Sequence, residues 1–502
     1  MIMTRSLLSL IFVSLIYSQH QADIPWPTLA NSAWPMIKYD PQFTGRSPYK
    51  GPQTPTVIWT VDMPYGIFSG PVIGEDNNLY FGSYYNFGDY FYCYNKDGQY
   101  IWNYNLGRVY PPRTGIVIDS SNTIYFGASD GYFYALNTDG TLKWEYQTSA
   151  AFGFAITNID LLGNLYLPND AGQLFSFSPE GSLNWSVTFE GGFRSRSPVF
   201  SPDGNTIYIA GRDSNLFALN LDGSLKWKLS CGKIQSASMV DSEGNIYFIA
   251  SSYLYSLNPA GNLNWNYFTF WNTVAIPTID KEGNIYAIVY DTTCCPYYPK
   301  LVSLSHNGEL RWEYIFDDEE SDEFRQPLIC DSEGTVYVGS TNGYNYYAIS
   351  SEGELKWKLP LTFGEQQVDN TGAISKDGTL YLGVHDVSML SAQTKTLIAI
   401  RDTGTVSVSE NDMNLKDYSL SQNYPNPFNP ITTISYQIKE RGFVKLIVYN
   451  ILGKKIATLV NEEQTRSNYS VNFDGNNLPS GVYIYTLIVN GFTKNKKMIL
   501  LR

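Results

Sequence analysis

The sequence predicts an all-β protein: an eight-bladed β-propeller closed by an N-terminal strand, followed by a small immunoglobulin-like β-sandwich. Three observations support this fold class. A tryptophan recurs about every 42 residues through most of the chain, which is the repeat length of a propeller blade. The 502 residues include 40 tyrosines and 41 glycines, which favour strands and tight turns. The period stops after residue 402, where a segment of different composition begins.

The N-terminus has the features of a secretory signal peptide. Arg5 gives the first residues a positive charge, residues 7–16 form a short apolar stretch, and Ser18 is a small residue suited to cleavage. We therefore expect residues 1–18 to direct export and residues 19–55 to form a leader before the first blade. No later run reaches the roughly 18 apolar residues that a membrane-spanning helix needs, so we expect no membrane span.

The repeating unit contains four strand-like segments. In the second unit, residues 115–146 read GIVIDSSNTIYFGASDGYFYALNTDGTLKWEY, with three apolar or alternating runs and a final run around the tryptophan. Asp, Asn and Gly residues separate the runs, as is typical of turns between antiparallel strands. We expect the tryptophan of the fourth strand to pack against the neighbouring blade. Eight positions hold this structural residue: Trp59, Trp102, Trp144, Trp185, Trp227, Trp265, Trp312 and Trp357.

The two ends of the repeat region complement each other. Residues 372–404 supply three strands without a final tryptophan strand, whereas Trp59 lies in a strand that has no three strands before it. Together they form one blade in addition to the seven complete units. We therefore expect eight blades in residues 56–402, closed by the N-terminal strand, an arrangement that leaves no free sheet edge.

The recurring pattern L-N-x-D-G-x-L-x-W, found for example at residues 136–144, resembles the repeats of quinoprotein-like propellers. Residues 34–52 are also similar to the leader of many such proteins, so the resemblance covers about residues 34–402. It implies the propeller fold. Some propellers of this family are dehydrogenases that bind pyrroloquinoline quinone and calcium on the axis, often beneath a disulfide between adjacent cysteines. No acidic residues of this chain match their catalytic site, so no catalytic residue is carried over.

Blade geometry separates the turns from the loops. With strands named A to D from the axis outward, the A–B and C–D turns lie on one face of the ring and the B–C and D–A loops on the other. The turns are short and alike, such as DSEGN at residues 241–245, whereas the other loops vary. Variable loops on a rigid scaffold commonly carry function. We therefore expect the B–C and D–A loops to form the working face.

Aromatic and arginine side chains in the D–A loops are the candidate ligand-binding residues. An arginine beside an aromatic ring can bind a carboxylate and stack on a sugar or a peptide. The alternative is that the rings fill the axis or pack between blades, and the sequence leaves both interpretations open. The candidates are Arg108, Tyr110, Arg113, Phe193, Arg194, Arg196, Phe270 and Trp271.

The adjacent residues Cys294 and Cys295 lie in the expected B–C loop of the sixth blade and are a further candidate. The resemblance to quinone dehydrogenases would place this pair over a cofactor, whereas the simpler interpretation is a stiff loop. We favour the stiff loop, because these units lack the long insertions that build the pocket in those enzymes. We therefore predict no cofactor; pyrroloquinoline quinone with calcium enters only if the chain is such an enzyme.

Composition argues against several function classes. The net charge of −13 disfavours nucleic acid as a partner, because phosphate binding needs surplus lysine and arginine. The scattered histidines His20, His306 and His385 do not suggest a metal cluster or a Ser-His-Asp site. The acidic run at residues 316–324 lacks the spacing of a calcium loop, and we expect it to be solvated. Five cysteines do not define a disulfide framework.

The segment after residue 402 predicts a second domain. Residues 403–417 are polar and are expected to link the ring to a sandwich of residues 418–502, in which strand-like runs alternate with turns. This stretch resembles the C-terminal sorting domain of type IX secretion cargo. The motifs that carry the resemblance are LSQNYPNPFNP at residues 420–430, VYNILGKKI at 448–456, LPSGVYIY at 478–485 and the basic end KNKKMILLR.

The sorting-domain resemblance implies recognition by the type IX secretion machinery and an extracellular or outer-surface location. With the ring, it predicts an exported binding or scaffold protein whose ligand is a glycan, a peptide or another protein. The rival is a secreted quinone-dependent dehydrogenase-like enzyme, and a third class is a platform for protein assembly at the outer membrane. Short loops and the lack of matching catalytic residues favour a binding protein over an enzyme.

Overall fold

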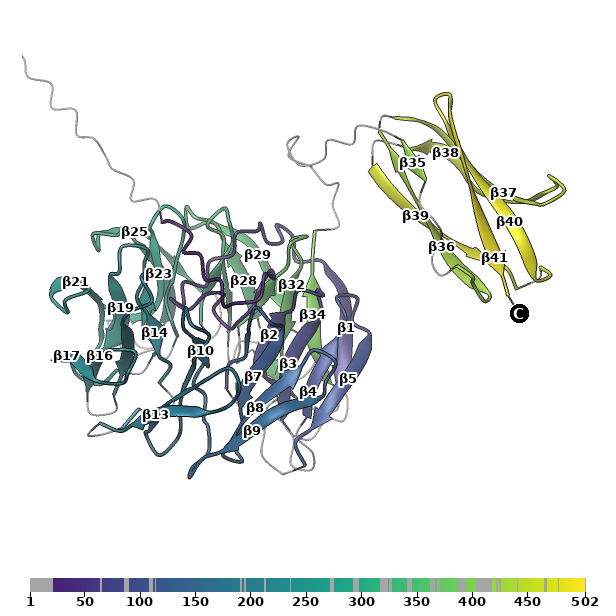
Figure 1. Ribbon diagram of the computed structural model, residues 1–502. Coiled ribbons are helices and arrows are strands. Elements are labelled where there is room, and N and C mark those ends of the chain that lie inside the picture. Colours follow the sequence, from purple (N-terminus) through teal and green to yellow (C-terminus); the bar gives the residue numbers. More distant parts are fainter. Residues whose placement is uncertain are drawn as a thin grey trace, which may run out of the picture. The chain divides into compact units, whose positions relative to one another are not determined.

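The protein is described here by a computed structural model, in which all the regular secondary structure of the described residues is β-strand (Figure 1). The all-β prediction is confirmed. The chain divides into two compact units, Met1–Gly404 and Thr405–Arg502. The described residues are 21–501 without 64–65, 85–89, 108–111, 113, 190–191, 194–195, 212–213, 235, 271–274, 292–297, 317–323, 325–326, 341–344, 362–365, 368–370, 387–393, 403–417, 421–422, 424–425, 440, 465–466 and 477.

In the first unit the described strands form eight antiparallel sheets of four strands each, which we number as blades 1 to 8. Blades 1 to 4 consist of β2 (Gly66–Ile73), β3 (Leu79–Tyr84), β4 (Tyr90–Tyr94) and β5 (Tyr100–Asn105); β6 (Val117–Ile118), β7 (Thr123–Gly127), β8 (Tyr132–Asn137) and β9 (Leu142–Gln147); β10 (Asn158–Ile159), β11 (Leu165–Pro168), β12 (Leu174–Phe177) and β13 (Leu183–Val187); and β14 (Val199–Phe200), β15 (Ile207–Ala210), β16 (Asn215–Leu219) and β17 (Leu225–Ser230).

Blades 5 to 8 continue this order, and blade 8 ends on the N-terminal strand. They consist of β18 (Met239–Val240), β19 (Ile246–Ala250), β20 (Tyr253–Leu257) and β21 (Leu263–Phe268); β22 (Thr278–Ile279), β23 (Ile285–Asp291), β24 (Tyr298–Leu304) and β25 (Leu310–Ile315); β26 (Ile329–Cys330), β27 (Val336–Gly339), β28 (Asn345–Ile349) and β29 (Leu355–Pro360); and β31 (Ala373–Ile374), β32 (Leu380–Gly383), β34 (Thr394–Ile400) and β1 (Val57–Met63). A short pair, β30 (Gln366–Gln367) and β33 (His385–Asp386), lies outside the blades.

The repeated tryptophans join each blade to the next. Trp144 of blade 2 donates its indole N–H to the carbonyl of Pro179 in the C–D turn of blade 3, at 2.9 Å. All eight tryptophans make such a bond, at 2.7–3.2 Å. Trp357 bonds Pro52, which precedes β1, and Trp59 of blade 8 bonds Lys96 of blade 1. These hydrogen bonds link the eight sheets into a closed cycle.

The contact between the tryptophan of one blade and the C–D turn of the next also requires a glycine in that turn. Gly140 has a φ of +86°, a conformation that side chains other than glycine rarely adopt. A Cβ atom at Gly140 would lie 2.7 Å from the indole of Trp102 in the preceding blade. Gly181 stands in the same relation to Trp144, at 2.6 Å. The turn motif therefore repeats because it both reverses the chain and makes room for the tryptophan of the neighbouring blade.

The leader packs along the inner ends of the blades rather than lying outside the ring. Leu29 bridges to Asp119, Trp34 to Ile73 and Met36 to Val117. Four leader carbonyls accept hydrogen bonds from strand A of four consecutive blades: Pro41 from Phe200, Gln42 from Val240, Thr44 from Thr278 and Gly45 from Cys330. The leader therefore links the A strands around the axis and forms part of the core of the ring.

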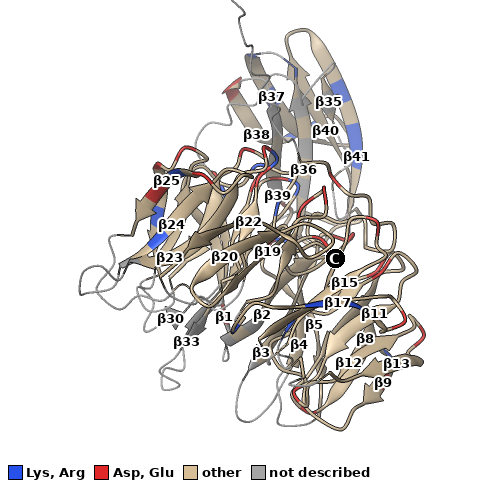
Figure 2. Cartoon of the chain, turned by 90° about the vertical axis from the view of Figure 1, so that its left-hand side faces the viewer, with Lys and Arg blue, Asp and Glu red and all other residues tan. Residues whose placement is uncertain are grey.

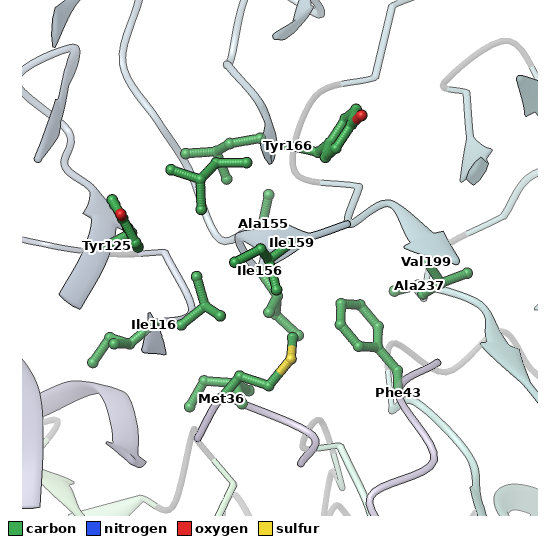
Figure 3. Close-up of a cluster of buried hydrophobic side chains, with 14 of the residues drawn as sticks. Met36, Phe43, Ile116, Tyr125, Ala155, Ile156, Ile159, Tyr166, Val199 and Ala237 are labelled. Carbon is green, nitrogen blue, oxygen red and sulfur yellow. The ribbon is translucent and has the colours of Figure 1, made fainter. Parts of the chain in front are cut away.

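Leader side chains also complete the largest hydrophobic cluster. Met36 and Phe43 are fully buried and lie among strand A and D–A loop residues of several blades (Figure 3). The other labelled members of the close-up are Ile116, Tyr125, Ala155, Ile156, Ile159, Tyr166, Val199 and Ala237. The axial core therefore depends on residues that precede the first blade in the sequence.

Lys38 is an ionisable group buried within this leader. Its Nζ donates hydrogen bonds to the carbonyls of Pro277 and Leu328, at 2.7 and 2.6 Å. Burial lowers the pKa of Lys38 to about 7, although Cys330 and Asp40 oppose this shift. Burial also raises the pKa of Asp40. The two carbonyls come from the segments that enter blades 6 and 7, so Lys38 ties the leader to both.

The second unit is a small two-sheet sandwich. A three-stranded sheet contains β35 (Ser419–Leu420), β36 (Ile431–Ile438) and β39 (Ser467–Asp474), and a four-stranded sheet contains β38 (Lys455–Gln464), β37 (Gly442–Asn450), β40 (Gly481–Val489) and β41 (Phe492–Leu500). Both sheets contribute to one buried cluster, with Ile434 and Tyr436 from β36 and Val448 and Tyr485 from the facing sheet. The unit therefore has its own core.

Candidate functional site

Most of the loop residues predicted as ligand contacts lie outside the described residues. They are Arg108, Tyr110, Arg113, Arg194, Trp271, Cys294 and Cys295. The acidic run between Phe316 and Phe324 also lies outside them, apart from its two phenylalanines. These two residues are buried, and their rings stack with centroids 4.2 Å apart.

Two of the predicted D–A loop residues are part of the packing between blades. Phe193 is fully buried and packs edge-to-face on Phe189 and Phe217, with ring centroids 5.6 and 5.5 Å away. Arg196 donates from Nη2 to the carbonyl of Ile234, in the next D–A loop, at 2.6 Å. These contacts favour the packing interpretation for both residues.

Phe270 belongs to an aromatic group that reaches the surface. It has a φ of +62°, and its ring lies 4.5 Å from that of Phe268, which is 44% exposed. Phe268 in turn contacts Tyr253, at 5.1 Å between centroids. Of the described candidates, Phe270 is therefore the one whose surroundings allow contact with a ligand on the predicted working face.

A pocket between blades 4 and 5 was not predicted from the sequence. It has a volume of about 410 Å³, within the range of small-molecule sites. It lies beside the A–B turns and the C–D turn of blade 5, away from the predicted working face. Its lining consists of Ser201, Pro202, Asp203, Thr206, Tyr208, Lys226, Trp227, Ser242, Glu243, Gly244, Pro259 and Ala260.

The pocket combines two aromatic rings, those of Tyr208 and Trp227, with charged and hydroxyl groups. Asp203 accepts hydrogen bonds from the Ser201 hydroxyl at 2.5 Å and the Asn205 amide at 3.1 Å. The Ser201 bond, together with Asn205 and the charge of Lys226, lowers the pKa of Asp203. Lys226 donates to the hydroxyl of Thr206 at 2.8 Å. Carboxylates that stay ionised and fixed in position are suitable acceptors for ligand hydroxyl or ammonium groups.

The pocket forms where blade 4 departs from the repeat. In blade 5 the A–B turn begins with Asp241, which accepts a hydrogen bond from the Tyr247 hydroxyl at 3.0 Å. Blade 4 has Ser201 at that position and one additional residue before its tyrosine, Tyr208. The burial of Tyr208 raises its pKa to about 12, so its hydroxyl keeps its proton at neutral pH.

Among the described C–D turns, the one in blade 5 leaves the largest distance between its glycine and the tryptophan of the preceding blade. A Cβ atom at Gly261 would lie 3.3 Å from Trp227, whereas the corresponding distance is 2.5–3.1 Å at the other six turn glycines. The NPAGN turn that contains Gly261 carries Ala260 where most of the other turns carry an acidic residue. The longer SPDGN turn and this substitution were the sequence signals for the pocket, and they were visible only as small deviations from the repeat.

Comparison with known proteins finds a similar family for each unit. A family model described as outer membrane protein assembly factor BamB matches residues 51–179 and 162–296. The crystal structure of BamB from Moraxella catarrhalis has a TM-score of 0.52 and 17% identity, covering 70% of this chain and 98% of that one. The model of the secretion system C-terminal sorting domain matches residues 422–501. The chain therefore carries a BamB-like repeat domain and a secretion-system sorting domain. No curated protein matches it.

The BamB-like ring shows no metal-binding group of three or more His, Cys, Asp or Glu side chains within its described residues, and neither does the sorting domain. Cys93 and Cys330 are buried within the ring. Burial raises the pKa of Cys93 and of Cys330 to about 12, which makes both poor nucleophiles at neutral pH. Among the described residues no helix is long and apolar enough to span a membrane.

Proposed function

We propose that the protein is an exported binding or scaffold propeller, which the type IX secretion route carries to the cell surface or beyond. The observation that carries this proposal is the sorting-domain match at residues 422–501 on a chain whose other unit is a BamB-like ring. A sorting domain indicates export. A closed ring of rigid blades is suited to presenting loops and inter-blade pockets to a ligand.

The pocket between blades 4 and 5 supports binding of a small polar group, such as part of a saccharide. Asp203 and Glu243 supply carboxylate acceptors, and Lys226 supplies a donor. The rings of Tyr208 and Trp227 supply an apolar surface. Sugars offer this combination of hydroxyl groups and an apolar ring face. The dehydrogenase alternative rests on the resemblance to quinoprotein-like propellers and on the pair Cys294 and Cys295. This pair lies outside the described residues, so no contact of the described residues favours the alternative over binding.

The export half of the proposal predicts that deletion of residues 418–502 stops passage through the outer membrane. The ring should then accumulate in the periplasm of a host with type IX secretion, because it keeps its own core and loses only the sorting unit. Fractionation and immunoblotting measure this, and protease resistance of the periplasmic form checks that the ring has folded. Secretion of the truncated chain at the full-length level would contradict the proposal.

The binding half predicts that a saccharide found on a glycan array loses affinity when the pocket is altered. Glu243→Gln should weaken binding by roughly tenfold, since a hydrogen bond to a charged group contributes about 1.5–3 kcal/mol. Glu282→Gln is the matched control, because Glu282 has the same position in the A–B turn of blade 6 and lies outside the pocket lining. Equal binding by the two variants would exclude this pocket as the site, and a parallel peptide array tests the other ligand class.

A further inference from the structure

The turn between β37 and β38 carries the most exposed aliphatic side chain among the described residues. Leu452 is 86% exposed and its neighbour Ile451 is 70% exposed. Most buried aliphatic side chains of this unit face the core between its two sheets, whereas these two project from its end. Exposing adjacent large aliphatic side chains to water is unfavourable, and such a patch commonly marks a contact surface.

The turn is ordered by its own hydrogen bonds. The side-chain oxygen of Asn450 accepts from the amides of Leu452 and Lys454, at 3.0 and 2.9 Å. The Gly453 amide donates to the Asn450 carbonyl at 3.0 Å, and Gly453 has a φ of +74°. Ile451 and Leu452 are therefore held at the tip of a defined turn.

Basic and apolar groups gather at this end of the sheet. Lys454 and Lys455 follow the two aliphatic residues after Gly453, and both are exposed. Strand pairing places Gly481 beside Leu500, so that exposed Val482 and Leu501 lie at the same end as the turn. The acidic residues of the hairpin, Glu462 and Glu463, lie at its other end, where they pair with Val444 and Phe443.

A turn in the ring also exposes a leucine, and it differs from the turn at residues 451–455 in having no lysines beside it. Leu162 is 76% exposed in the turn DLLGN at residues 160–164, and its amide also donates to the side chain of the first turn residue, Asp160. There the leucine is followed by glycine and asparagine, without lysine. The two turns are alike in backbone and apolar content, and they differ in the charge around them.

The sorting unit as a whole also differs from the ring in net charge. Residues 405–502 contain 11 lysines and arginines and 7 aspartates and glutamates, a net charge of +4, whereas residues 1–404 carry −17. Figure 2 shows basic residues along β41 of the sorting unit and acidic residues along the turns of the ring. A basic, apolar tip on a basic domain complements an anionic surface.

We propose that the tip formed by residues 451–455 inserts into an anionic lipid surface. Ile451 and Leu452 would enter the boundary between headgroups and acyl chains, while the ammonium groups of Lys454 and Lys455 bind lipid phosphates. A projecting pair of aliphatic side chains beside two lysines suits a headgroup layer. This inference adds to the proposed export the kind of surface that the sorting domain contacts.

Vesicle binding by the purified full-length chain tests this proposal without relying on secretion. Co-sedimentation with vesicles of phosphatidylcholine and phosphatidylglycerol should show binding that falls as salt rises. Leu452→Asp should reduce the partition coefficient at least about tenfold, because it replaces a membrane-inserted side chain with an anion. Lys454→Gln with Lys455→Gln should remove most of the difference between anionic and pure phosphatidylcholine vesicles.

Leu162→Asp is the matched control and should leave binding unchanged. Absence of vesicle binding by the native chain would overturn the proposal, as would equal losses in Leu452→Asp and Leu162→Asp. Loss of secretion in Leu452→Asp with unaltered vesicle binding would assign the tip to a protein partner instead. Failure of the truncation experiment would overturn the export route and leave the vesicle result standing.

Discussion

Phe43→Ala should lower the free energy of unfolding of the ring by about 3–5 kcal/mol. Phe43 is fully buried and belongs to the axial cluster, although it lies in the leader and in no blade. Its removal would leave a cavity beside residues such as Val199 and Ala237, in strand A of blade 4 and the D–A loop before blade 5 (Figure 3). These side chains are fixed by separate sheets and cannot move together to fill the space.

Urea unfolding followed by tryptophan fluorescence measures this effect in the intact protein. All 11 tryptophans precede residue 358, so the signal reports on the ring and not on the sorting domain. Phe154→Ala is the matched control, because Phe154 is 56% exposed in a D–A loop and should cost less than about 1 kcal/mol. Equal shifts in the two unfolding midpoints would show that the leader is not part of the core.

The repeat made the ring predictable, because its signals are local. The tryptophan, the turn glycine and the alternating strands all act within one blade or between neighbours. Each was therefore visible eight or seven times in the sequence, and the pairing of β1 with β34 follows from counting strands. The sorting domain was predictable for a different reason, since its motifs stand at several separate positions in a fixed order.

The packing of the leader and the pocket could not be predicted in the same way. Leader residues contact A strands as far away as Cys330, through single hydrogen bonds that leave no periodic pattern. The pocket between blades 4 and 5 results from one additional residue after Ser201 and a small shift at Gly261. Such deviations have meaning only once the neighbouring blades are placed side by side. Phe193 shows the converse, since an aromatic residue in a variable loop proved to be buried packing.

The second large effect is a dependence of stability on pH that arises from Lys38. Burial lowers its pKa from 10.5 to about 7 in the folded protein, whereas the unfolded chain keeps a pKa near the ordinary value of about 10.4. Between these values the unfolded chain binds one more proton than the folded chain, so stability rises with pH. This contribution is complete above the unfolded pKa and is lost as the pH falls through the folded pKa of about 7.

Lys38→Met isolates this contribution. The variant loses the two hydrogen bonds to the carbonyls of Pro277 and Leu328, and it also loses the titrating group. The stability of the native chain relative to the variant should therefore increase by about 1.4 kcal/mol per pH unit as the pH rises above 7. Unfolding free energies measured between pH 6 and pH 9 would show this as a change in the difference between the two curves, in favour of the native chain as the pH rises. The slope of that difference should correspond to roughly one proton.

Lys50→Met controls for the loss of positive charge as such, because Lys50 is a half-exposed leader residue paired with Glu333 at 2.8 Å. Its curve should stay close to that of the native chain. Asp40 and Cys330 face Lys38 and also have shifted pKa values, but burial raises both of them. Cys330 keeps its proton in the folded protein, where its pKa is about 12, whereas in the unfolded chain it titrates at about pH 8.5. This effect is common to the native chain and Lys38→Met, so it cancels in their difference. Parallel curves for the native chain and Lys38→Met would mean that Lys38 keeps its charge at pH 9, held by the two carbonyls that it joins.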